Sequence, residues 1–189
     1  MEADAGEPIV SLVIRSAKPK DADALARIEA EVWRDAYPSL VPDRYLTATL
    51  APERRRGVWR RRLAGAERSR TVVAHDGDSG ETAGYATFGP SRWPLLPFGG
   101  EIYELYLRPD HQGRGYGRAL CVWIADRFLE IRIASACVEV LAGNHSRFFY
   151  ETLGGRLVAH GAHTLAGVRL PTLIYGWDDV RALARAAAP

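Results

Sequence analysis

The chain of 189 residues contains only two cysteines, and it has no Cys-x-x-Cys pair or Cys/His cluster. A structural zinc site or a disulfide framework needs several such residues at characteristic spacings, so we expect neither. Cys121 and Cys137 lie inside apolar runs. We therefore expect them to be buried free thiols.

Long apolar runs and a strong charge of one sign are also missing. No apolar run approaches the roughly 20 residues that a membrane helix needs, and residues 1–8 lack the pattern of a secretory signal. The expectation is a cytoplasmic protein with no membrane partner. The formal net charge is +2, which is too weak to indicate a nucleic-acid partner.

The composition that is present is that of a globular protein. Hydrophobic residues make up 47% of the chain and charged residues 25%. The length favours one domain that can bury its own core. We expect a flexible arm at 1–8, a domain at 9–178 and a C-terminal tail at 179–189, where the tail is a short helix or a frayed end.

Hydrophobic periodicity and turn residues predict an α/β fold, with helices packed on a central sheet. Strands are expected at 9–15, 71–75, 82–88, 101–107, 136–141, 156–159 and 169–175. Helices are expected to begin near residue 21 and to cover 45–64, 115–131 and 144–153, with an interruption near Pro52.

The most informative segment is LYLRPDHQGRGYGRAL, residues 105–120. A strand runs into a turn with three glycines, and a helix begins within that turn. Glycines allow close backbone approach, and the unpaired amides of a helix start attract phosphate. No Gly-Lys-Ser/Thr follows, and Leu120 stands where a G-x-G-x-x-G motif needs glycine. A strand-to-helix turn with no ligand is the plain alternative.

This loop resembles a known family. Residues 112–117, QGRGYG, match the Q/R-x-x-G-x-G/A signature of GNAT N-acetyltransferases. Residues 144–155 resemble the N-x-x-A/R-x-x-F-Y-E-x-L-G segment of the same superfamily, and 32–42 and 167–177 also look like its members. The resemblance spans roughly 9–178. It implies a mixed, largely antiparallel, splayed sheet flanked by helices, with acetyl-CoA as co-substrate and an amine as acceptor.

The same resemblance implies which residues hold acetyl-CoA. The backbone of Leu105, Tyr106 and Leu107 would pair with the pantetheine arm as an added strand would, and Asn144 would hydrogen-bond that arm. Backbone amides would hold the pyrophosphate. Those amides belong to Gln112, Gly113, Arg114, Gly115, Tyr116, Gly117 and Arg118.

Transfer to an amine requires proton handling. An alkyl ammonium has a pKa near ~10.4, so only about one in a thousand molecules is neutral at pH 7. A base must remove a proton, and the leaving thiolate benefits from a donor. Tyr150 occupies the family's acid position and is the predicted donor. In this family the amide at the Leu107 position supplies the oxyanion contact.

Three carboxylates are candidates for the base. Glu101 is favoured, because its spacing to Gln112 equals that of the catalytic glutamate in the histone-acetyltransferase branch. Glu139 is the alternative and matches the glutamate of ribosomal-protein N-terminal acetyltransferases. Glu104 is the third, and simple strand alternation predicts that it faces away from Glu101.

Other features remain open at this level. The arginines of residues 54–62 are expected to form a solvated helix face, with Trp59 and Leu63 turned inward; an acidic partner is the alternative. A non-catalytic acyl-CoA sensor and a nucleic-acid-binding domain are the rival functions. Homodimers are common in the superfamily. The acceptor loops, 33–44 and 89–100, carry no signature that identifies the amine.

Overall fold

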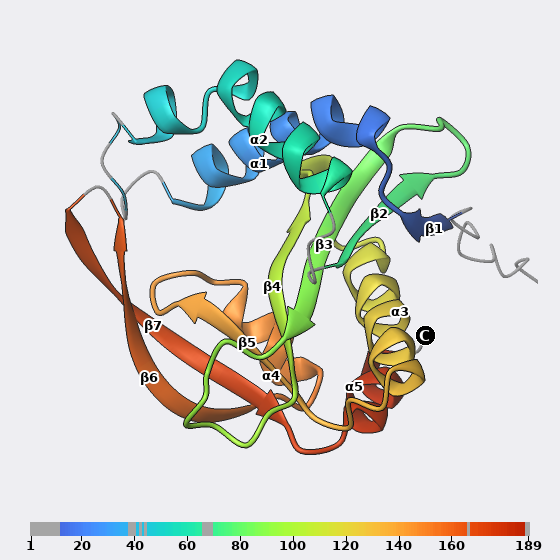
Figure 1. The fold of residues 1–189 in the computed structure, drawn as a ribbon, viewed down its shortest axis with the longest axis vertical. Coiled ribbons are helices and arrows are strands. Elements are labelled where there is room, and N and C mark those ends of the chain that lie inside the picture. The colour runs from blue at the N-terminus through green and yellow to red at the C-terminus, as the bar shows by residue number, and fades with distance from the viewer. Residues whose placement is uncertain are drawn as a thin grey trace, which may run out of the picture.

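A single seven-stranded sheet forms the centre of the computed structural model, which describes residues 12–37, 41, 43, 45–65, 70–165 and 167–187 (Figure 1). The strand order is β1-β2-β3-β4-β5-β7-β6. Neighbouring strands are antiparallel except β4 and β5, which run parallel. The strands are β1 (Leu12–Ser16), β2 (Arg70–Asp76), β3 (Thr82–Pro90), β4 (Gly100–Leu107), β5 (Ala136–Leu141), β6 (Arg156–Leu165) and β7 (Val168–Trp177). The predicted mixed, largely antiparallel sheet is confirmed.

Helices cover both faces of this sheet (Figure 1). Helices α1 (Ala22–Ala36) and α2 (Pro52–Ala64) lie on one face, while α3 (Tyr116–Glu130) and α5 (Val180–Ala187) lie on the other. The shorter elements are η1 (Pro19–Asp21), η2 (Tyr45–Thr49), η3 (Pro109–His111) and α4 (Arg147–Thr152). The predicted interruption is confirmed, because η2 ends at Thr49 and α2 starts at Pro52, a position where proline needs no amide partner.

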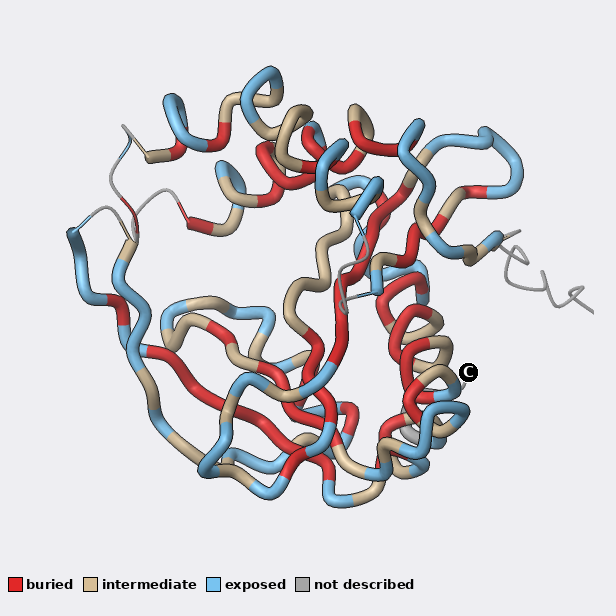
Figure 2. The backbone as a smooth tube through the Cα atoms, in the orientation of Figure 1, coloured by how far each residue is buried: buried red, intermediate tan, exposed pale blue. Residues whose placement is uncertain are grey.

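Each face has its own apolar cluster. Leu25, Ile28 and Val32 recur at helical spacing on α1 and are all buried, together with Trp59 of α2, against β2 and β3. On the other face α3 packs on the central strands through residues such as Leu120 and Phe128. Figure 2 shows the resulting pattern, in which β3 is buried along almost its whole length.

The C-terminal segment takes part in this packing. Val180 and Leu183 of α5 are fully buried, and α5 lies against α3. The helical alternative for this segment is thereby confirmed, whereas the predicted arm at 1–8 lies outside the described residues. Cys121 and Cys137 are buried free thiols as expected, and burial raises the pKa of each to about 12. Within the described residues, no helix is long and apolar enough to cross a bilayer.

The β6–β7 hairpin is longer than the sequence predicted. Its strands cover 156–165 and 168–177, instead of 156–159 and 169–175. Strand β6 is an edge strand whose residues are mostly exposed, and its middle reads Ala-His-Gly-Ala-His. Such a segment has no alternating apolar pattern to reveal a strand. The pairing of β6 with β7 therefore could not be predicted from the local sequence and is seen only in the folded chain.

Two irregularities in β4 shape the centre of the sheet. First, β4 and β5 share only three residue pairs, the last being Ile102 with Val138, and then they diverge. Second, Thr87 of β3 pairs with Glu104 whereas Phe88 pairs with Ile102, so β4 carries an extra residue, a β-bulge, at Tyr103. The prediction that Glu104 faces away from Glu101 is wrong for this reason, since a bulge shifts the alternation by one. Both carboxylates lie on the face that α1 and α2 cover.

Candidate active site

A cavity of about 890 Å³ opens where β4 and β5 diverge. One wall is β4 from Tyr103 to Leu107, and the facing wall is β5 from Val138 to Leu141. The glycine loop and α4 close one end, which we call the loop end. Side chains of α1, η2 and the β6–β7 hairpin line the other end, which we call the hairpin end. The splay predicted from the sequence is therefore the origin of the cavity.

The free edge of β4 lies along this cavity. Leu105, Tyr106 and Leu107 pair with β3 on one side, and beyond Ile102 their other side has no ladder partner in β5. An extended chain in the gap would find unpaired backbone groups there. The pairing of this edge with a pantetheine arm stays a prediction.

The glycine loop has the conformation that an anion site requires. Gly113 and Gly115 have φ of +74° and +84°, and a Cβ placed on either would meet no atom within 4 Å. Gly115 is the N-cap of α3, so the first amides of that helix are available to a ligand. Residues 112–115 are exposed, and Arg118 is half-buried at the cavity wall. The Gln112 side chain donates to Leu107 O at 3.2 Å, which ties the loop back to β4.

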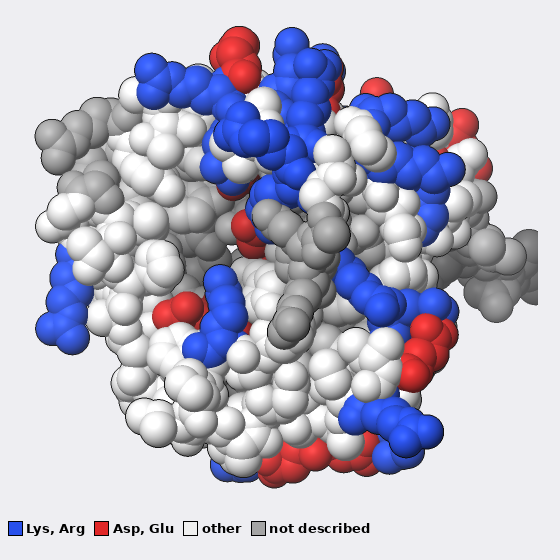
Figure 3. Space-filling view, viewed as in Figure 1, with Lys and Arg blue, Asp and Glu red and all other residues white. Residues whose placement is uncertain are grey.

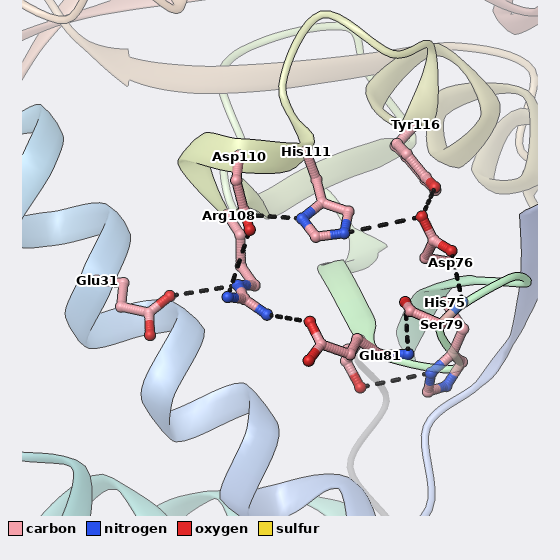
Figure 4. Close-up of polar contacts among 10 residues, drawn as sticks. Glu31, His75, Asp76, Ser79, Glu81, Arg108, Asp110, His111 and Tyr116 are labelled. Carbon is pink, nitrogen blue, oxygen red and sulfur yellow. Dashed lines mark hydrogen bonds and ion pairs between the residues drawn. The ribbon is translucent and has the colours of Figure 1, made fainter. Parts of the chain in front are cut away.

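A polar cluster supports this loop on the side away from the cavity (Figure 4). Tyr116 is buried, with its side chain turned away from the cavity, and its hydroxyl donates to Asp76 Oδ2 at 2.9 Å. Burial and this bond raise the pKa of Tyr116 to about 12, so the phenol remains a donor. Asp76 also accepts the amides of Asp78 and Ser79, each at 3.0 Å. His111 lies between Asp110, 2.8 Å away, and Asp76, 3.9 Å away.

Helix α4 presents the predicted acid. Tyr150 lines the cavity, is 5% exposed, and packs between the rings of Phe149 and Trp177. Burial raises the pKa of its phenol. Asn144 precedes α4 and already has partners, since its Nδ2 donates to Tyr37 Oη at 2.6 Å and its Oδ1 accepts the Ser146 amide. This bond places Tyr37 beside the predicted cofactor contact.

The three candidate bases differ sharply in their surroundings. Glu101 is fully buried, is not part of the cavity wall, and accepts both the backbone amide and the guanidinium of Arg92, the latter at 2.6 Å. Glu104 lines the cavity and contacts Arg62 and the Thr87 hydroxyl. Burial raises the pKa of Glu104 despite the nearby Arg62. Glu139 lines the cavity, with no hydrogen bond or salt bridge to any described residue.

Comparison with known proteins gives this arrangement a family. The model of the Acetyltransferase (GNAT) family matches residues 25–155, which include β4, the glycine loop and α4. The chain belongs to the GNAT family. Acetyl-CoA is the co-substrate of GNAT enzymes, so this protein is an acyltransferase of that family.

Individual relatives agree with the GNAT assignment. The chain is 33% identical over 172 residues to the N-acetyltransferase YuaI of Bacillus subtilis, which is itself uncharacterized; the match covers 91% of this chain and 96% of YuaI. The fold is similar to that of YncA from Salmonella typhimurium, solved with its cofactor acetyl-CoA: TM-score 0.62, 21% identity, 88% and 93% coverage. It is also similar to the PaiA N-acetyltransferase of Thermoplasma acidophilum in complex with coenzyme A: TM-score 0.61, 15% identity, 86% and 98% coverage.

The arginines of α2 are largely engaged within the GNAT fold. Arg55 pairs with Glu29 at 2.6 Å, Arg56 with Asp23 at 3.0 Å, and Arg62 lies over the Trp59 ring. Trp59 is fully buried and Leu63 packs beside it, so the predicted inward orientation of both is confirmed. Figure 3 shows these basic side chains crowded over α2, above a hollow with acidic atoms at its rim.

Several site residues had no signal in the sequence. Arg92, Glu29 and Thr172 come from three separate segments and line or support the cavity only in the folded chain. The aromatic residues Trp33 and Tyr37, which lie on a predicted acceptor segment, do reach the cavity. Phe98 instead fills the core beside Cys137 and Ile174.

Proposed function

We propose that this chain transfers the acetyl group of acetyl-CoA to a primary amine, directly and without a covalent enzyme intermediate. The observation that carries the proposal is the cavity at the β4–β5 divergence, which has the glycine loop at one end and carboxylates at the other. Such a cavity brings a thioester and an amine together from opposite ends. Positioning of this kind supplies a large part of the catalysis in bimolecular transfers.

The loop end would hold the cofactor through backbone groups. The amides of residues 112–118 would receive the pyrophosphate, with Arg114 and Arg118 adding positive charge. The free edge formed by Leu105, Tyr106 and Leu107 would pair with the pantetheine arm, and Asn144 would contact that arm. The open space at Gly113 and Gly115 supports this assignment, because a side chain at either position would occupy the anion's place.

Two protons move during the reaction. A base takes one from the ammonium, the neutral nitrogen then attacks the thioester carbonyl, and the carbon–sulfur bond breaks as the thiolate leaves. Tyr150 would donate the proton that the thiolate gains, and the second proton that the nitrogen loses as the amide forms would restore the Tyr150 phenol. Burial raises the pKa of Tyr150, which keeps the phenol protonated but also makes it a weaker acid. The position of Tyr150 at the cavity wall is therefore what supports the role of donor.

For the base, the surroundings favour Glu139 over Glu101. A carboxylate held by four hydrogen bonds from Arg92 and away from the cavity wall is poorly placed to take a proton from an amine. Glu139 faces the cavity and has its oxygens free of described partners. We therefore propose Glu139 as the base and Glu101 as the residue that orients Arg92.

Thermal unfolding tests the cofactor site first. Acetyl-CoA at a hundredfold excess over its dissociation constant should add about 2.7 kcal/mol to the free energy of unfolding. That corresponds to roughly 5–10 °C in Tm for a chain of this length. Gly115→Glu should abolish the shift. Gly167→Glu is the matched control, because Gly167 also has a positive φ of +82° and open space, but lies in the β6–β7 turn.

Release of CoA thiol with an amine panel separates an enzyme from a sensor. A catalyst should release CoA only when an accepted amine is present, and Tyr150→Phe should slow that release while the thermal shift stays. A shift with no release for any amine would favour the sensor. An equal shift with ATP or NAD would contradict the proposed cofactor site.

A further inference from the structure

At the hairpin end of the cavity, Glu139 differs from every neighbouring glutamate. Glu29 accepts the Arg55 guanidinium at 2.6 Å and the Trp59 indole at 3.0 Å. Glu104 is paired with Arg62, and Glu101 with Arg92. Each of these carboxylates therefore has a cation beside it. Glu139 has none within salt-bridge distance among the residues that the structure describes, so its charge is available to a ligand.

A second unsatisfied group lies next to it. Thr172 of β7 lines the cavity and is 2% exposed, yet its Oγ1 has no hydrogen-bond partner in the described part of the chain. A buried hydroxyl without a partner is costly unless a ligand satisfies it. Gly161 of β6 pairs with Thr172, and a Cβ built on Gly161 would lie 2.7 Å from Thr172 Oγ1 and 3.6 Å from Glu139 Oε1. The hydroxyl and the carboxylate are thus close neighbours on the cavity floor.

Arg92 lies within range of the charge of Glu139 but bonds another carboxylate. Its guanidinium bonds both oxygens of Glu101 and lies 4.3 Å from the centre of the Tyr103 ring. A ligand carboxylate near Glu139 would be repelled by that carboxylate and would meet an arginine that already bonds Glu101. An ammonium at the same place could donate a charge-assisted hydrogen bond to each carboxylate oxygen of Glu139.

Apolar residues pack together at the outer part of the hairpin end in the described part of the chain. Leu46 and Leu50, in and just after η2, form one cluster with Leu170 of β7 and the half-buried Leu165 of β6. Trp33 of α1 and Tyr37, which directly follows α1, belong to the same cluster, with ring centroids 4.7 Å apart, and line the cavity. An acceptor therefore meets aromatic and aliphatic walls beyond the carboxylate. These walls, in a cavity of about 890 Å³, suit an uncharged body of limited size.

We propose that the acceptor is a small primary amine with an uncharged body, whose ammonium is held by Glu139 and the Thr172 hydroxyl. An acceptor with a carboxylate next to the amine is disfavoured, and so is a peptide. The proposal rests on the acetyltransferase function proposed above and narrows its substrate class. It also explains why a buried threonine hydroxyl persists without a protein partner.

Three probes with the same phenylethyl group test the substrate class. They are 2-phenylethylamine, phenylalanine, which adds one carboxylate, and the peptide amide Phe-Ala-Ala-NH₂, which adds bulk without that carboxylate. CoA release at saturating acetyl-CoA gives kcat/KM for each. We expect 2-phenylethylamine to exceed the other two by at least tenfold. Equal or higher values for phenylalanine or the peptide, or no acetylation of 2-phenylethylamine, would overturn the proposal.

Thr172→Val tests the hydroxyl itself. Valine preserves the shape and removes only the unsatisfied oxygen, so the folded state should be at least as stable. The KM for 2-phenylethylamine should rise about tenfold, the range for a lost hydrogen bond to a charged group, with kcat changed far less. Thr164→Val is the matched control, because Thr164 is an exposed threonine on the neighbouring strand β6. An unchanged KM in Thr172→Val, or the same rise in both variants, would refute the role of the hydroxyl.

The outcomes also distinguish the two proposals. If acetyl-CoA raises Tm and the peptide or amino acid is acetylated, the acetyltransferase function stands and the substrate class is wrong. If acetyl-CoA produces no shift and no acceptor releases CoA, both fail together.

Discussion

The two ends of the cavity are formed by different kinds of chemical group. The loop end uses backbone: amides at the start of α3, glycines with positive φ, and the free edge of β4. The hairpin end uses side chains from α1, α2, β5, β6 and β7. Backbone recognition depends on a short local segment, whereas side-chain recognition depends on how distant segments meet. The loop end can therefore be altered by changes in one local segment, and the hairpin end by single changes in several distant segments.

The largest expected effect concerns the hairpin end. Glu139→Gln should lower kcat/KM by about 10²–10⁴-fold, the usual contribution of a general base. Part of this loss should return as pH rises toward the pKa of the amine, because the acceptor then deprotonates without help. A profile of kcat/KM from pH 6 to pH 10 measures both the loss and its recovery at high pH.

Glu101→Gln is the comparison variant for that experiment. It keeps the buried shape and weakens only the contact with Arg92, so kcat/KM should fall much less than in Glu139→Gln. The reverse order would restore Glu101, the residue that the sequence favoured, as the base.

The next largest effect is expected on kcat, from a change at Tyr150 of α4. Tyr150→Phe should reduce kcat by about a hundredfold if the phenol protonates the thiolate, while acetyl-CoA binding is nearly unchanged. Tyr175→Phe serves as control, because its hydroxyl bonds Glu151 at 2.6 Å and has no part in the proposed chemistry. Calorimetric titration gives the binding constant and CoA release gives kcat. Similar losses of kcat in both variants would point to packing rather than acid catalysis.

A smaller effect, on acetyl-CoA binding, is expected from a change at Tyr116, which supports the glycine loop. Tyr116→Phe removes the bond to Asp76 that fixes the loop from below, so the dissociation constant for acetyl-CoA should rise by roughly three- to tenfold. The KM for the amine should not change. Tyr85→Phe is the control, since the Tyr85 hydroxyl is buried without a partner in the described structure and its loss should be neutral. An effect on the amine alone would contradict the separation of the two ends.

The smallest expected effect is on stability in acid. Amide bonds from the 78–79 turn and the Tyr116 hydroxyl lower the pKa of Asp76 to about 2. The resulting stability is fully present above the ordinary carboxyl pKa, near ~3.9, and is lost as pH falls through that range toward 2. Asp76→Asn should therefore lose less Tm than the wild type between pH 5 and pH 2. Parallel melting curves at several pH values test this.

The division between the loop end and the hairpin end also separates what could be predicted from the sequence from what could not. The glycine loop was recognisable because its conformation needs glycine at fixed places and a helix directly after them. The position of Glu104 was mispredicted because one extra residue at Tyr103 reverses the alternation, and no residue type marks such a bulge. Thr172 had no signal, because its importance depends on Glu139, which lies on another strand. Arg92 lies only nine residues from Glu101, but its loop carries no pattern that predicts their contact.

The divergence of β4 from β5 has a further consequence for the molecule as a whole. Sheet edges normally lie on the outside of a protein, where they invite pairing with other chains and are protected by charges, prolines or bulges. This sheet has an edge in its middle, along Leu105–Leu107, and the cavity lies beside it. A pantetheine arm in that cavity would satisfy the edge. By the same reasoning, the chain without acetyl-CoA should be the form more open to strand exchange between molecules.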